Sequence, residues 1–186
     1  MMRYLVALLL LVVSFHAQAS EVLWKRLQTE PNLVVLMRHA QVGEGNSRVW
    51  DPSGRCQGER MLTEEGKTYA RKLGEEFRKR QITPVVICSP MCRTRDTANL
   101  AFGSAVTDPD LREIGSAQAS QKHAFRDKAK QLLLKHRGAK PVVFVSHRPN
   151  IDTLALEVVA TDELLVGRIG GDGEIEVLGR IRSQPQ

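Results

Sequence analysis

Three short apolar runs, each followed by polar or charged residues, constrain the fold of this 186-residue chain most strongly. The runs and the residues they lead to are Leu33–Met37 before Arg38 and His39, Val85–Cys88 before Ser89 and Arg93, and Val142–Val145 before Ser146 and His147. Near-continuous apolar runs of this length are typical of parallel strands that are buried on both faces. Because ligands of α/β proteins bind at the carboxyl ends of such strands, we expect the two histidines and two arginines to share one site.

Helical patterns alternate with these strands. Thr63 can cap a helix with its hydroxyl, and Glu64 and Glu65 then fall in the first turn, where the helix dipole favours acids. The expected helices cover residues 21–28, 63–80, 93–102, 122–137 and 150–160, and the last should bury Ile151, Leu154, Ala155 and Val158. A glycine-rich turn at 170–173 predicts a hairpin of 164–169 with 174–178. We therefore predict an α/β three-layer sandwich with a mostly parallel central sheet flanked by helices and a C-terminal hairpin.

The N-terminus has the pattern of a secretory signal. A basic start is followed by an apolar run over residues 4–15 and by small residues at Ala17 and Ala19. We predict a signal peptide over residues 1–19, a single domain over 20–186, and a periplasmic or secreted product. An uncleaved anchor is the alternative, but the apolar run is short for a membrane span. We expect no stable membrane insertion after cleavage.

The formal net charge of +6 is moderate. A solvated basic surface accounts for it, and so does attraction of an anionic substrate or envelope surface. No basic run is interleaved with aromatic residues, so we expect no nucleic-acid partner. Oligomeric state cannot be read from the sequence.

Three cysteines are present: Cys56, Cys88 and Cys92. An exported protein can form disulfides, and an odd count leaves one thiol over. Cys88 falls inside a predicted strand, so Cys56 and Cys92 are the expected pair, although spacing alone leaves the pairing open. The spacing does not suggest a zinc site, and we expect no metal and no cofactor.

The four strand-end residues have the chemistry of a phosphoryl-transfer site. A neutral imidazole can attack phosphorus, which makes His39 the candidate nucleophile, and the neighbouring Arg38 disfavours its protonation. The planar guanidinium of Arg93 matches two phosphate oxygens, and His147 can donate to another at the start of a helix. Arg95, by contrast, is expected on the helix surface.

Four motifs in this order resemble those of the histidine phosphatase superfamily, the phosphoglycerate-mutase-like fold: Arg38-His39-Ala40, Leu62–Gly66, Ser89–Ala98 and Val145–His147. The resemblance implies that His39 is phosphorylated and that Arg38, Arg93 and His147 complete the phosphate pocket. Leu111–Gly115 is similar to the segment that supplies the proton donor in the phosphatase branch, which implies Glu113, with Asp110 as the substitute. To remain protonated, Glu113 should be desolvated or lie near another carboxylate.

The resemblance implies an exported phosphomonoesterase of the acid-phosphatase type that acts on a phosphorylated small molecule or glycan. Residues 147–151 look like those of small exported members, some of which act on phosphate groups of the lipopolysaccharide core, so an envelope glycan or lipopolysaccharide is the expected substrate by analogy. Family positions that often hold Gly and Asn carry Ala40 and Met61 here, which weakens any transfer of substrate identity. The alternatives are a catalytically silent phospho-ligand binding protein and, with less support, a mutase.

Overall fold

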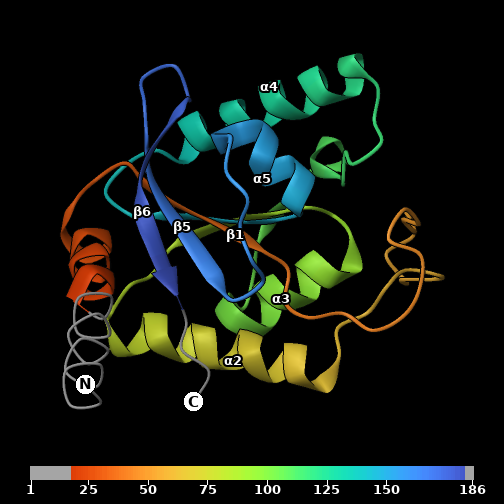
Figure 1. Cartoon of the computed structure of the whole chain (residues 1–186), viewed down its shortest axis with the longest axis horizontal. Helices are drawn as coiled ribbons and strands as arrows, with labels where there is room; N and C mark the ends of the chain where they lie inside the picture. The colour runs from red at the N-terminus through yellow and green to blue at the C-terminus, as the bar shows by residue number, and fades with distance from the viewer. Residues whose placement is uncertain (1–17, 183–186) are drawn as a thin grey trace, which may run out of the picture.

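The apolar runs form the centre of a six-stranded sheet in the computed structural model, which describes residues 18–182 (Figure 1). The strands are β1 (Leu33–Arg38), β2 (Val85–Cys88), β3 (Val106–Thr107), β4 (Val142–Ser146), β5 (Glu163–Ile169) and β6 (Ile175–Arg182). Their order is β3-β2-β4-β1-β5-β6. The first four strands are parallel, whereas β5 and β6 form an antiparallel hairpin against β1. The predicted fold class and hairpin are therefore confirmed.

Helices cover both faces of the sheet, as Figure 1 shows. They are a helix over 18–29, α2 (Glu64–Lys79), α3 (Cys92–Phe102), α4 (Ala119–His136) and α5 (Arg148–Ala155), with a 3-10 turn at Pro109–Leu111. The first three pack on one face and α4 and α5 on the other. Thr63 caps α2 as predicted, because its hydroxyl oxygen accepts from the Gly66 backbone N–H at 3.1 Å.

Side chains alternate between the two cores along each strand. In β1, Val35 and Met37 pack beneath α2, whereas Val34 and Leu36 pack against α4 and α5. Burial on both faces is the reason that these strands appear in the sequence as unbroken apolar runs.

The helix predicted over 150–160 is wrong at its C-terminus. It ends at Ala155, and Leu156 adopts the left-handed conformation with φ 54°. Ile151 and Leu154 are buried as expected, but Val158 lies beyond the helix and is 51% exposed, while Val159 takes the core position. The helical spacing of buried apolar residues therefore does not extend beyond Ala155.

The predicted signal peptide lies almost wholly outside the described residues, which include only its last two positions. Over residues 18–182, no helix combines the length and the apolar character that a membrane crossing requires.

The position of α3, which carries Arg93, depends on a close approach to α2. A Cβ atom added to Gly74 of α2 would lie 2.1 Å from the carbonyl oxygen of Ala101 in α3. Because that neighbour is backbone, a larger residue at position 74 must push the two helices apart.

We predict that Gly74→Ala lowers the free energy of unfolding by about 2–3 kcal/mol, because overpacking outweighs the better helix propensity of alanine. Urea denaturation measures the change. Gly138→Ala is the matched control, since nothing lies within 4 Å of its added Cβ, and it should change stability by less than about 0.5 kcal/mol. Equal effects of the two substitutions would contradict this account of the helix contact.

Candidate active site

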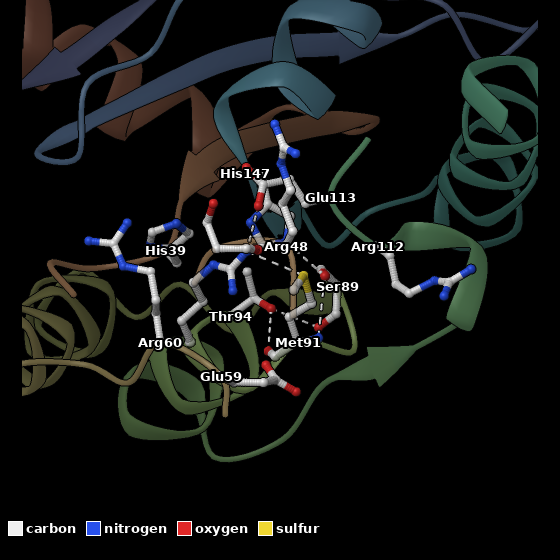
Figure 2. Close-up of polar contacts among 12 residues, drawn as sticks. His39, Arg48, Glu59, Arg60, Ser89, Met91, Thr94, Arg112, Glu113 and His147 are labelled. Atoms are coloured by element: carbon white, nitrogen blue, oxygen red, sulfur yellow. Dashed lines mark hydrogen bonds and ion pairs between the residues drawn. The ribbon is translucent and has the colours of Figure 1, made fainter. Parts of the chain in front are cut away.

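The carboxyl ends of β1 and β4 bring the two predicted histidines together (Figure 2). The strands are adjacent and parallel, with Arg38 opposite Ser146 in the register. His39 and His147 follow these residues, and their ring centroids lie 5.5 Å apart. The expected meeting of strand ends is therefore present in the structure.

His39 is held as a neutral imidazole with one free nitrogen. Its Nδ1 lies 2.9 Å from the carbonyl oxygen of Ala40. A carbonyl can only accept, so Nδ1 carries the proton and Nε2 keeps its lone pair. The pKa of His39 is lowered to about 4, chiefly by burial and in part by the positive charges of Arg93, Arg38 and Arg60, against the opposing effect of the hydrogen bond to Ala40. The free nitrogen is thus nucleophilic well below neutral pH.

Arg93 extends into the site from the first turn of α3 and is 1% exposed. Its Nη2 donates to a Glu113 carboxylate oxygen at 2.6 Å and to the Ser47 carbonyl at 3.0 Å. Its Nη1 is buried and has no hydrogen-bond partner among the described residues. A guanidinium with a free buried N–H has unused capacity for an anion.

Unpartnered buried polar atoms gather at this edge of the sheet. Of the five such side-chain atoms in residues 18–182, four lie here: Arg38 Nε, Arg93 Nη1, Ser146 Oγ and His147 Nδ1. Buried polar groups in folded proteins are nearly always satisfied, so a cluster of exceptions calls for an explanation. Donors on two arginines and a histidine are what a phosphate group would satisfy.

His147 is completely buried, and its Nε2 faces the Ser89 hydroxyl group. The Ser89 hydroxyl oxygen accepts weakly from the Met91 backbone N–H at 3.4 Å and lies 2.9 Å from His147 Nε2. When the hydroxyl group donates its proton to Nε2, the ring proton lies on Nδ1, which has no hydrogen-bond partner among the described residues. Burial lowers the pKa of His147 well below its ordinary value, and Arg93 lowers it further. His147 is thus a neutral donor.

His39 lines a pocket of about 320 Å³, and the wall also contains Arg38, Arg60, Arg93 and Glu113. Arg60 donates from Nε to the Gly43 carbonyl at 2.9 Å, and its charge contributes to lowering the pKa of His39. In the sequence, Arg60 lies in a polar loop with Arg48 and Arg55, where contact with a second anionic group and a solvated loop explain the three arginines equally well.

Glu113 lies in the pocket wall as predicted, but its surroundings differ from the expectation. Its side chain is 25% exposed, and its partner is the Arg93 guanidinium and not a second carboxylate. Asp110, the substitute candidate, is exposed in the 3-10 turn and does not line this pocket. Glu113, and not Asp110, therefore lies beside Arg93 in the wall of this pocket.

The Asn150 side chain forms hydrogen bonds with the backbone on both sides of Glu113. Its buried side chain accepts from the Ile114 backbone N–H at 3.2 Å and donates to the Arg112 carbonyl at 2.8 Å. Asn150 belongs to the first turn of α5, just after His147. Its hydrogen bonds therefore link the backbone segment of Glu113 to the segment that carries the second histidine.

A disulfide and a hydrogen bond attach the polar loop over residues 41–60 to the N-terminus of α3. Cys56 and Cys92 form the predicted disulfide, and Cys88 is free and buried. Glu59 is also buried and accepts from the Cys92 backbone N–H at 2.7 Å, where the helix dipole favours a negative charge. Arg95 is not the plain surface residue that we expected, since it is half-buried and donates to the Gly54 carbonyl at 3.0 Å.

Within residues 18–182, no group of three or more histidine, cysteine or acidic side chains is arranged to hold a metal ion.

The fold and the site together define an α/β protein in which two histidines and several arginines meet at the carboxyl ends of the central strands. A family model described as "Histidine phosphatase superfamily (branch 1)" matches residues 34–132. An acid phosphatase of Mycobacterium tuberculosis is 30% identical, over 61% of this chain and 69% of that protein. The chain belongs to the histidine phosphatase superfamily and is a phosphatase.

Solved structures agree on the fold. The product of open reading frame Rv3214 from Mycobacterium tuberculosis is 23% identical with a TM-score of 0.57, covering 80% of this chain and 96% of that one. A structure from Nakamurella multipartitia assigned to the phosphohistidine phosphatase SixA is 20% identical with a TM-score of 0.58, covering 82% and 98% of the two chains.

We predict that Asn150→Ala lowers the free energy of unfolding by about 2–3 kcal/mol, because it leaves the Arg112 carbonyl and the Ile114 N–H unsatisfied. Chemical denaturation of the purified protein measures the loss. Asn99→Ala, at an exposed position on α3, is the control and should change stability by less than about 0.5 kcal/mol. If both variants are equally stable, Asn150 does not hold the Glu113 segment.

Proposed function

We propose that this phosphatase is a phosphomonoesterase that forms a phosphohistidine intermediate on His39. The single observation that carries the proposal is the neutral His39 beside buried, unpartnered donors on Arg38, Arg93 and His147. These donors would hold the non-bridging oxygens of a phosphoryl group, where negative charge is greatest during transfer.

In the first step, His39 Nε2 attacks phosphorus and the bond from phosphorus to the ester oxygen breaks. The leaving oxygen takes a proton from the Glu113 carboxyl group and departs as an alcohol. Glu113 is paired with Arg93 in the free enzyme. A bound phosphate shares that guanidinium and adds negative charge beside the carboxylate, and both effects favour its protonated form.

In the second step, a water molecule attacks phosphorus and gives a proton to the Glu113 carboxylate. The bond from His39 Nε2 to phosphorus breaks, and inorganic phosphate leaves. The free imidazole and the protonated acid are restored, so the cycle closes without a further reactant.

His39→Ala should lower the kcat/KM for p-nitrophenyl phosphate by about a thousandfold or more, because the nucleophile is removed. Rapid quench into base after mixing with ³²P-labelled substrate should show a base-stable phosphoprotein in the wild type and none in the variant. His123→Ala, at an exposed position on α4, is the control. Full activity of the His39 variant would contradict the mechanism.

Glu113→Gln should impair esters in proportion to the basicity of their leaving group. An alkyl phosphate needs a proton on its departing oxygen and should lose about 10²- to 10⁴-fold in kcat/KM, whereas p-nitrophenyl phosphate should lose much less. Steady-state rates across a series of leaving groups test this dependence. Equal losses for activated and unactivated esters would show that Glu113 is not the acid.

We further propose that the protein is exported and acts on a phosphorylated envelope glycan or lipopolysaccharide. The basic start, the apolar run over 4–15 and the small residues at Ala17 and Ala19 support export. The net charge, +6 for the full chain and +5 once Arg3 is removed, suits an anionic surface. Expressed in full in a bacterium with a periplasm, the protein should appear in that compartment with Ser20 as its first residue. Retention in the cytoplasm with residues 1–19 attached would contradict export.

A further inference from the structure

A second pocket adjoins the phosphate pocket. It measures about 630 Å³, roughly twice the size of its neighbour, and the two share Ser47 and Glu113 as wall residues. The second pocket is therefore the continuation of the site beyond Glu113. Its size far exceeds the needs of a phosphoryl group.

The position of Glu113 between the two pockets determines which part of a substrate lies in the second pocket. Under the proposed function, the phosphoryl group lies against His39 and the ester oxygen faces Glu113. Figure 2 shows His39 and Arg60 on one side of Glu113 and Arg112 on the other. The alcohol part of the ester must therefore extend into the pocket that Arg112 lines.

The wall of the second pocket carries two arginines without carboxylate partners. Neither guanidinium, of Arg48 or of Arg112, forms an ion pair with a described residue. Arg112 lies over the Trp50 ring at 4.5 Å, a contact that joins the 41–60 loop to the segment of Glu113. Its Nε donates to the Pro109 carbonyl, which leaves the other guanidinium N–H groups available.

Glu113 and Asp110, the acidic residues in the wall of the second pocket, form no ion pair with either arginine. Glu113 is paired with Arg93, and Asp110 is exposed and accepts no side-chain bond from either arginine. The pocket thus presents two available guanidinium groups, which are suited to bind phosphate or carboxylate oxygens in pairs. The wall also contains Gln121 and Ala124, and the volume of about 630 Å³ accommodates a polyhydroxylated ring.

We infer that Arg48 and Arg112 form a binding site for a second anionic group on the leaving alcohol. The inference rests on the proposed phosphomonoesterase activity, and it narrows the substrate to a sugar-sized ester that carries a further phosphate or carboxylate. The disulfide and Glu59 attach the loop that bears Arg48 to α3. This attachment suits the proposed site, since a mobile loop would not hold the second charge at a constant distance from His39.

A binding experiment tests the site without requiring turnover. In the His39→Ala protein, titration calorimetry compares glucose 1,6-bisphosphate with glucose 6-phosphate. We expect the bisphosphate to bind about tenfold or more tightly. Adding Arg48→Ala or Arg112→Ala should reduce this preference by about five- to tenfold, because one pair of charge-assisted hydrogen bonds is lost.

Arg55→Ala is the matched control. Arg55 lies in the same loop and carries the same charge, but it bonds to Ser53 and lines neither pocket. It should leave the preference unchanged, whereas an equal reduction by all three substitutions would show a general charge effect and overturn the inference.

The outcomes separate this inference from the proposed function. Equal affinity for the two sugars, or a preference that survives loss of Arg48 and Arg112, overturns the second anion site even if the wild-type protein hydrolyses phosphate esters. If the wild type hydrolyses no ester while the arginine variants lose the preference, the second site stands and the phosphomonoesterase proposal fails.

Discussion

The buried guanidinium of Arg93 is the interaction on which the site depends. One of its nitrogens is committed to Glu113 and Ser47, while the other remains without a partner among the described residues. Leaving such a donor unsatisfied costs about 1–3 kcal/mol. The fold tolerates that cost because its cores on both faces of the sheet are extensive, and a bound phosphate would recover it.

Contacts from neighbouring segments fix the position of α3, the helix that carries Arg93. The Thr97 hydroxyl of α3 accepts from the Ala40 N–H and donates to the Arg93 carbonyl, which links the first histidine to the arginine helix. Glu59 and the Cys56–Cys92 disulfide attach the 41–60 loop to the same helix terminus. These contacts join the residues of the site into one unit, and charges that are preorganised in this way favour catalysis.

The sequence could predict those features that depend on local pattern. Apolar runs predicted β1, β2 and β4 because burial on both faces demands them, and the ends of these strands predicted the meeting of His39, Arg93 and His147. The family resemblance added Glu113, which no periodicity or spacing indicates. Its placement beside Arg93 follows from the same topology.

Other features depend on contacts that are distant in sequence. Arg60 lies in a loop whose path is set by Glu59 and a disulfide, so nothing near it in the sequence distinguishes it from Arg55. The partner of Glu113 is 20 residues away in another element. The early end of α5 depends on the left-handed Leu156, a residue type that rarely adopts that conformation.

The most direct test of the account is the protonation state of His39, since a neutral imidazole with Nδ1 protonated is what makes Nε2 a nucleophile. Long-range ¹H–¹⁵N correlation spectra of the free protein, recorded from pH 8 to pH 3.5, report both ring nitrogens. We predict that Nδ1 carries the proton and that the ring takes up a second proton only near pH 4. A ring that titrates near its ordinary value of about 6.5, or one that carries its proton on Nε2, would contradict it.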